Sequence, residues 1–275
     1  ELFELIDKLD SSKQELLENI SNTRNKVLRL AIQGKLVEQG EDDEPASLLL
    51  ERIKAEKEQL IKDKVIKKEK PLPDISEEEK SFDLPKGWEW CRLGQLYNIV
   101  RGSSPRPKGH PKYFTESKTE YNWVTIKDIT LFLDGKYLYN TNEYLTYEGS
   151  LKSRFIKSGE IIIAVSGSIG KTAIMGTDGY IYDGLAGLKN IVDNEILRDY
   201  IYIALNAWKE HLNNISEGTS IQNINTEKLN LLNIALPPLE EQKRIVEKFD
   251  LIMDYLDKLQ QEIESQEVIL EDILK

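Results

Sequence analysis

Hydrophobic residues at the two ends of the chain recur at the spacing of long helices. Within residues 1–34 they alternate three and four positions apart, and from residue 240 the same spacing continues for most of the remaining chain. The second helix would be about 50 Å long at 1.5 Å per residue, and it needs a partner to cover its apolar face. We therefore expect the two long α-helices to pair as an antiparallel coiled coil. The residues predicted to form this pairing are Ile6, Leu9, Leu16, Ile20, Phe249, Ile252, Leu256, Leu259 and Ile263.

The rest of the N-terminal region predicts a second helix and then a linker. Gly34 is suited to end the first helix, and Ser47 is suited to cap a second helix that continues to about residue 64. Residues 65–83 are rich in Lys, Glu and Pro, and the prolines would interrupt any helix there. We assign residues 1–64 to a helical region and residues 65–83 to an exposed linker.

The pattern changes again between Leu84 and Pro238. Short β-branched runs alternate with Gly, Ser and Asp turns, and Trp and Tyr are frequent. We expect strands near residues 123–126, 160–165 and 172–175, and a helix over residues 198–213. Residues 84–238 have the length of an ordinary domain, and they predict a mixed α/β (α+β) domain. The long C-terminal helix would then occupy residues 239–275.

Composition narrows the classes of function. The chain has 275 residues, one cysteine and two histidines, so an internal disulfide, a CxxC metal site and a His-based zinc enzyme are not expected. The spacing around His110, His211 and Cys91 shows no set of nucleophile and base. There is no run of about 18 apolar residues, and the acidic, amphipathic start is unlike a signal peptide. We expect a soluble, cytoplasmic, non-catalytic protein with no membrane segment. Because the first residue is not Met, we expect the sequence to be a cut or processed version.

The net charge of −11 hides an uneven distribution. Residues 84–238 hold 17 basic side chains against 16 acidic ones, whereas the rest of the chain holds 20 against 32. Within that domain, residues 86–127 carry eight basic and three acidic side chains. A protein that is acidic on average can therefore still present a basic face to nucleic acid.

The basic excess is concentrated in the segment Val100–Phe114, VRGSSPRPKGHPKYF. It holds four basic residues and no acid among several Gly and Pro, so it is unsuited to a core. Its charges suit contacts with phosphates. The alternative is a plain solvated loop, and the lack of any acid favours binding.

The segment Ser166–Thr172, SGSIGKT, is similar to a nucleotide-binding loop. The GxxxxGK[ST] pattern requires its first glycine at the position that Val165 occupies. The residues after Thr172 also do not predict the helix that such a loop must precede. A tight turn between two strands is the plainer interpretation. A third is that Ser168 and Lys171 offer donors to a phosphate backbone.

Several motifs, taken together and in this order, resemble the specificity (S) subunits of Type I restriction–modification systems. They are AIQGKLVEQ in the helical region, LPKGWEWCRLGQL at the start of the central domain, NWVTIKDI and VSGSIGKTAI within it, GTSIQNINTEKL near its end, and IALPPLEEQKRIVEKFD at the start of the last helix. The resemblance covers nearly the whole chain, and its specificity comes from the combination of motifs.

This resemblance implies a target-recognition domain flanked by conserved helices. It implies a non-catalytic subunit that recognises half of a bipartite site in double-stranded DNA and holds the methyltransferase (M) and restriction (R) subunits. No cofactor would belong to this chain, because S-adenosylmethionine and ATP with Mg²⁺ serve the partner subunits. Two other classes stay open: a nucleotide-binding protein that uses SGSIGKT, and a coiled-coil scaffold without DNA function.

The sequence holds one recognition domain, whereas a full-length subunit of this family has two. We therefore expect a half-length form, natural or truncated, in which two copies make a homodimer through their helices. Such a dimer would prefer a palindromic split site, because protein and DNA symmetry match. A helix of about 50 Å would limit the gap in that site to about 15 base pairs.

Three segments are expected to supply the side chains that contact DNA: the basic loop, the SGSIGKT turn and the Gln-Asn pair near the end of the domain. Their polar side chains suit phosphates and base edges. The turn and the Gln-Asn pair could instead be structural signatures of the family. The predicted residues are Arg101, Ser103, Arg106, Lys108, Lys112, Ser168, Lys171, Gln222 and Asn223, with no metal ligand and no catalytic residue among them.

Overall fold

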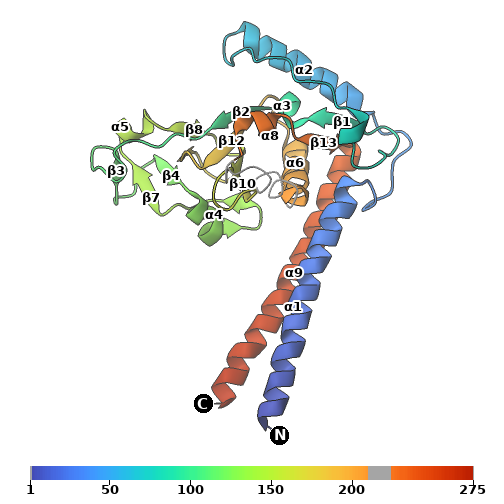
Figure 1. Ribbon diagram of the computed structural model, residues 1–275, viewed down its shortest axis with the longest axis vertical. Helices are drawn as coiled ribbons and strands as arrows, with labels where there is room; N and C mark the ends of the chain where they lie inside the picture. Colours follow the sequence, from blue (N-terminus) through green and yellow to red (C-terminus); the bar gives the residue numbers. More distant parts are fainter. Residues whose placement is uncertain (1, 210–223, 275) are drawn as a thin grey trace.

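Two long helices form an arm that projects from a mixed α/β domain (Figure 1). The computed structural model describes residues 2–209 and 224–274, and it describes their side chains except for residues 2–8, 10, 134 and 266–274. Helix α1 (Leu2–Ile32) and helix α9 (Leu239–Leu274) lie side by side and run in opposite directions. The predicted fold class, an α+β domain flanked by long helices that pair as an antiparallel coiled coil, is confirmed.

The seam of the arm is lined by one row of residues from each helix. Ile20 on α1 is only 4% exposed. Arg24 crosses the seam, where its guanidinium donates to Asp257 at 2.5 Å and to Gln260 at 2.7 Å. The buried or half-buried members on α9 are Phe249, Ile252, Leu256, Leu259 and Ile263. All five predicted residues of α9 are therefore covered at least in part, and Phe249 and Ile252 also pack on the core of the domain.

The row on α1 differs in part from the predicted one. Leu9 and Leu16 are 54% and 51% exposed, so they lie at the edge of the seam and not inside it. The covered side holds the predicted Ile20 together with Leu17, Arg24 and Ala31, which were not predicted. The helix turns this side inward because Arg24 finds partners across the seam and Ala31 is fully buried in the core. The side chain of Ile6, another predicted residue, lies outside the described ones.

Helix α2 (Ala46–Lys62) lies across the top of the molecule in Figure 1, at the end opposite the tip of the arm. Gly34 has a φ of +65° and ends α1 as predicted, because glycine adopts this left-handed conformation without steric cost. The second helix begins two residues earlier than expected, directly after Pro45, and so Ser47 lies in its first turn and does not cap it.

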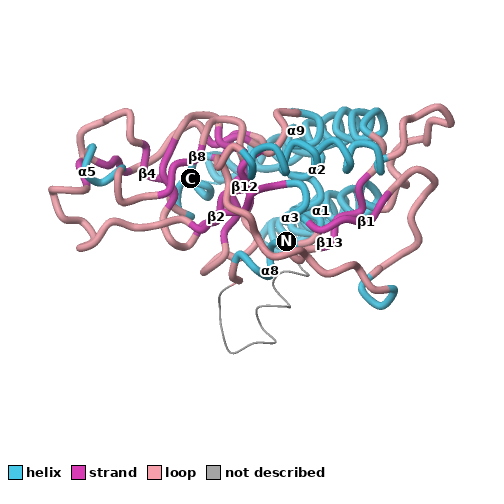
Figure 2. Tube along the Cα trace, turned by 90° about the horizontal axis from the view of Figure 1, so that it is seen from above, coloured by secondary structure: helices cyan, strands magenta, loops and turns pink. Residues whose placement is uncertain are grey.

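Three sheets build the domain. The smallest pairs β1 (Glu89–Arg92) with β13 (Asn233–Leu236) and thereby joins the start of the domain to its end. Across the six-stranded sheet the order is β2 (Tyr97–Arg101), β12 (Leu185–Asn190), β9 (Ile161–Ala164), β10 (Thr172–Met175), β6 (Tyr137–Leu138) and β5 (Leu133–Asp134). Across the five-stranded sheet it is β3 (Phe114–Thr115), β7 (Glu143–Leu145), β4 (Asn122–Val124), β11 (Gly179–Ile181) and β8 (Arg154–Ile156). From above, the strands of the two larger sheets lie to one side of α1 and α9, whereas β1 and β13 lie beside these helices (Figure 2).

Capping residues set where several helices of the domain begin. The strand expected over residues 123–126 ends at Val124, because Thr125 and Asp128 form a capping box that starts the next helix. The helix expected over residues 198–213 begins three residues earlier, where Asn194 caps it. These helices are η1 (Glu77–Glu79), α3 (Leu93–Leu96), α4 (Ile126–Phe132), α5 (Tyr147–Ser150), α6 (Glu195–Ala207) and α8 (Thr226–Asn230). No helix in the described part of the chain is both long and apolar enough to cross a membrane.

Helix α6 joins the domain to the arm, because it packs against both α1 and α9. An ion network strengthens this junction: the Lys136 ammonium lies 2.7 Å from Asp199 of α6 and 2.8 Å from Asp250 of α9. Burial lowers the pKa of Lys136, but the hydrogen bonds to the two carboxylates outweigh this effect and raise it. Lys136 therefore stays charged and holds the edge of the six-stranded sheet at a set orientation relative to the arm.

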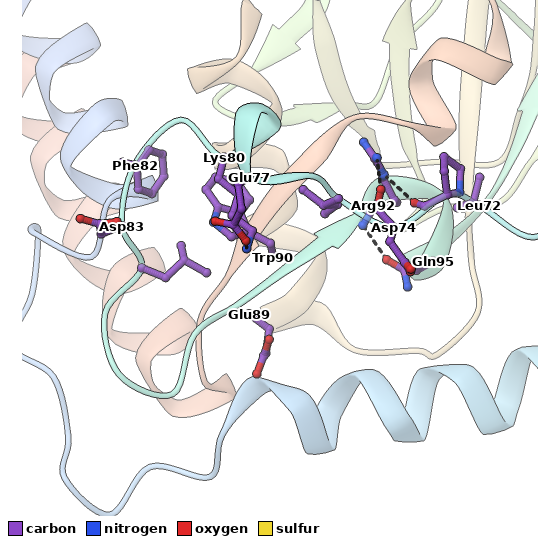
Figure 3. Close-up of a pocket in the computed structure, with 13 residues that line it drawn as sticks. Leu72, Asp74, Glu77, Lys80, Phe82, Asp83, Glu89, Trp90, Arg92 and Gln95 are labelled. Atoms are coloured by element: carbon purple, nitrogen blue, oxygen red, sulfur yellow. Dashed lines mark hydrogen bonds and ion pairs between the residues drawn. The ribbon is translucent and has the colours of Figure 1, made fainter.

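The linker before the domain is exposed along most of its length but is fastened at one point. Arg92 of β1 is only 4% exposed and donates to the carbonyl oxygens of Pro73 and Asp74 (Figure 3). It donates as well to both carboxylate oxygens of Glu79, at 2.7 and 3.0 Å. It also donates to the carbonyl oxygen of Leu231 at 2.8 Å. A bidentate guanidinium–carboxylate pair of this kind is among the stronger polar contacts in proteins. Arg92 thus ties the linker to both ends of the domain.

We predict that this attachment weakens in acid. The hydrogen bonds from Arg92 and from the Ser76 backbone lower the pKa of Glu79 to about 2, from an ordinary value of 4.5. Because the folded-state pKa is the lower one, the Glu79 contact stabilises the fold above pH 4.5 and loses this effect as the pH falls towards 2. The Tm, measured between pH 6 and 3, should therefore fall less in Glu79→Gln than in the wild type. Glu77→Gln, which changes an 88% exposed carboxylate of the same short helix, is the control and should follow the wild type. Parallel curves for all three proteins would contradict the prediction.

Candidate nucleic-acid interface

The basic loop leaves β2 and crosses the edge of the five-stranded sheet before it reaches β3. Its first residues are fixed by backbone hydrogen bonds: Gly102 donates to the Leu185 carbonyl at 2.9 Å and Ser103 to the Ile181 carbonyl at 3.0 Å. A Cβ at Gly102 would lie 1.9 Å from the Tyr182 carbonyl oxygen, so only glycine fits here. The close approach places the following residues beside the turn after β11.

Two of the predicted contact residues are used to hold this loop. The guanidinium of Arg101 donates to the carbonyl oxygen of Asp183 at 2.7 Å. The Ser103 hydroxyl donates to the Lys152 carbonyl at 3.0 Å, and the Ser103 carbonyl accepts from the Ser153 hydroxyl at 2.8 Å. Because their polar groups are directed at the backbone, Arg101 and Ser103 position the loop in this structure.

Within the described residues, the side chains of the other three basic residues of the loop donate no hydrogen bond to a backbone carbonyl. Arg106, Lys108 and Lys112 are all exposed. Lys112 lies with its ammonium 5.8 Å from the centre of the Tyr113 ring. Lys127, from the first turn of α4, joins Arg106 and Lys108 around one cavity. Three cations from two distant segments therefore meet at one place, as a phosphate-binding surface requires.

This cavity, of about 300 Å³, is walled by aromatic rings and contains two acids. Phe114 and Trp123 meet edge to face with their centroids 5.8 Å apart, and Tyr182 completes the wall. The carboxylates are Glu143 and Asp183. The cavity thus combines cations for phosphates with acceptors for the amino groups of bases.

The SGSIGKT segment is a turn between two strands. Strands β9 and β10 pair antiparallel on either side of it, and Gly167 and Gly170 have φ values of +70° and +82°. A phosphate loop needs a helix directly after it, and here a strand follows. The nucleotide-binding interpretation therefore loses its structural basis, and the turn interpretation is confirmed.

The predicted residues of this turn lie beside the same helix that supplies Lys127. Ser168 is exposed, and the Lys171 ammonium donates to the Thr130 hydroxyl of α4 at 2.8 Å. Helix α4 therefore lies between the turn and the cavity. Gln222 and Asn223, the last two predicted residues, lie outside the described residues.

Of the eleven residues that line the cavity, the predicted contact residues include only Arg106 and Lys108, and two of the missed ones are the charged residues Lys127 and Asp183. Lys127 belongs to the NWVTIKDI motif and lies between Thr125 and Asp128 of a Thr-x-x-Asp capping signal, which could have placed it at the start of a helix. Asp183 is paired with Arg106 although the two are 77 positions apart in the chain, and no local signal marks it.

Among the described residues, the remaining candidate chemistry does not gather into a reactive site, and His211 lies outside them. Cys91 is 1% exposed, and burial raises the pKa of its thiol. Across residues 2–209 and 224–274, no group of three His, Cys, Asp or Glu side chains is placed to hold a metal ion.

A domain that carries a basic, aromatic-walled cavity beside a rigid helical arm has the features of a nucleic-acid recognition module. The profile of the Type I restriction modification DNA specificity domain matches residues 85–269. The chain belongs to this family, and the predicted resemblance is confirmed.

Curated relatives and solved structures show the same family likeness. The specificity subunits of the Type I restriction enzymes EcoAI and EcoEI from Escherichia coli are 33% and 31% identical, over 88% and 90% of this chain. The chain spans only 41% and 42% of their lengths. A chain from a structure of type I R-M complex assembly superposes with a TM-score of 0.59 at 21% identity, and HsdS from Thermoanaerobacter tengcongensis with 0.52 at 20%. Each match covers 98% of this chain and 56% of the other. These two structures share the fold.

Proposed function

We propose that this chain is the DNA-specificity component of a Type I restriction–modification complex, that it acts in the cytoplasm, and that it performs no catalysis itself. Its central domain binds one half of a bipartite site in double-stranded DNA. The observation that carries the proposal is the cluster of Arg106, Lys108 and Lys127 around one cavity, in a chain that belongs to the specificity family. The two lysines hold phosphates and set the position on the duplex, and the other polar groups of the cavity read the bases.

The helices are proposed to hold the partner subunits. The methyltransferase (M) and restriction (R) subunits would supply the chemistry, with S-adenosylmethionine and with ATP and Mg²⁺. Support comes from the arm, where Leu9, Leu16, Leu251 and Tyr255 are each more than half exposed. Exposed apolar residues on one structural element are typical of a surface that another protein covers.

We also propose that two copies pair through their arms as a homodimer and so present two recognition domains. A two-fold pair reads the same half-site twice, in opposite orientations. The gap between the half-sites would then follow from the length of α9, whose 36 residues span about 54 Å. This length limits the gap to about 16 base pairs.

The proposal predicts that the recognition domain alone decides where DNA is modified. The complex with its M subunits should methylate adenines at one bipartite, palindromic sequence, as mapped by sequencing of modified bases. Replacing residues 84–238 by the matching domain of the EcoAI subunit, which is 33% identical, should move adenine methylation to a different sequence. A chimaera with the helices exchanged instead is the control and should keep the original site. If the methylated sequence does not change with the domain, the proposed function is wrong. A methylated sequence that changes but lacks two-fold symmetry would contradict the homodimer alone.

A further inference from the structure

The Arg106 guanidinium and the Asp183 carboxylate form an ion pair at the wall of the cavity. Arg106 Nη2 lies 2.9 Å from Asp183 Oδ2, and the two side chains are 69% and 46% exposed. An exposed pair of this kind contributes little to stability. The structure thus keeps a carboxylate in the wall of the same cavity as Lys108 and Lys127.

Asp183 is held more firmly than an exposed acid on a loop would be. Its backbone N–H donates to the Ser104 hydroxyl at 3.2 Å, and its carbonyl oxygen accepts from Arg101 at 2.7 Å. The neighbouring Gly102 lets the two loops approach closely, since a Cβ there would strike the backbone of Tyr182. The carboxylate is therefore presented at a defined place relative to Arg106.

A carboxylate at this place opposes non-specific binding, because it repels the phosphates that the neighbouring cations attract. It favours binding only where a base offers a donor. In the major groove, cytosine presents its N4 amino group as a donor, and guanine presents O6 and N7 as acceptors. An arginine suits guanine and an aspartate suits cytosine, so the two side chains together match the two halves of one G·C pair.

We propose that Arg106 and Asp183 act as one unit that reads a single G·C base pair in the major groove. Arg106 donates to guanine O6 and N7, and Asp183 accepts from cytosine N4. The ion pair between them can persist, because the guanidinium has five donors and the carboxylate has two oxygens. An A·T pair in the same place sets thymine O4 against the carboxylate, and so it is rejected. This inference rests on the proposed DNA-specificity function and names the base pair that this site selects.

The test is a methylation assay of the complete complex with its M subunits on a randomised DNA library. The wild type should require G·C at one position of the half-site. Asp183→Asn and Arg106→Lys should each relax that same position by about tenfold or more and leave the other positions unchanged. Asp183→Asn should also bind non-target DNA more tightly, because it removes a negative charge. Glu148→Gln, which neutralises another exposed acid of the domain, is the matched control and should keep the preference.

Three results would overturn the inference. If both variants weaken methylation equally at all sequences, Arg106 contacts phosphate only. If neither variant changes the preference while the wild type remains specific, the pair is structural and the proposed function stands. If the wild-type complex shows no sequence preference, the inference and the proposed function fail together. Thermal unfolding of each variant separates these results from misfolding, since an exposed pair should change the Tm little.

Discussion

Reversing the charges of Lys108 and Lys127 together should weaken DNA binding of the complex by roughly a hundredfold at low salt, and it should reduce the slope of log K against log salt by about two. Both ammonium groups line the cavity, and the described residues include no ion-pair partner for either one. They are therefore available to replace counterions on the phosphate backbone. Arg106 is left unchanged because it already has the Asp183 carboxylate as a neighbour.

The measurement is fluorescence anisotropy of a labelled duplex, titrated with wild-type and variant complexes at several salt concentrations. Lys86→Glu with Lys157→Glu is the matched control: both lysines are exposed, lie in residues 84–238 and do not line the cavity. This control should change the affinity only slightly. Equal losses in the two double variants would mean that net charge, and not this cavity, governs binding.

The helical part of the fold could be predicted well from the sequence because it depends on periodicity. The spacing of apolar residues predicted both long helices and their antiparallel pairing. It did not predict which neighbouring row of α1 faces inward, since Leu9, Leu16 and Leu17 are equally apolar. That choice depends on Arg24, which pairs with Asp257 and Gln260 more than 230 positions away. A contact at that separation leaves no local signal.

The candidate site could be predicted in outline but not in detail. The loop from Val100 to Phe114 was recognisable by its charge alone, and the structure exposes its central cations. The sequence could not show that Arg101 and Ser103 face backbone carbonyls, because side-chain direction depends on the strands packed beside them. Asp183 could not be predicted for the same reason: the pairing of β2 with β12 and the close approach at Gly102 bring it beside Arg106.

Leu256→Asp should separate the two helices of the arm and leave the domain folded. Leu256 is 6% exposed in the seam, so the substitution both removes its apolar contacts and places a carboxylate at a buried position. Changes of this type cost about 3–5 kcal/mol. The domain should survive because its core cluster joins α9 only through residues up to Met253.

Hydrogen exchange distinguishes this local effect from global unfolding. Amides of α1 before Ile20 and of α9 after Leu256 should lose protection in Leu256→Asp, whereas those of β9 and β10 should keep it. Leu251→Asp introduces the same charge on the same helix at a position that is 65% exposed, and it should leave the protection of the arm intact. Partner binding then separates two roles of the arm. If only Leu256→Asp prevents assembly with the M subunits, the paired arm itself is required; if Leu251→Asp does so with the arm intact, the exposed face is the contact. Unchanged protection in Leu256→Asp would show that this seam does not hold the helices together.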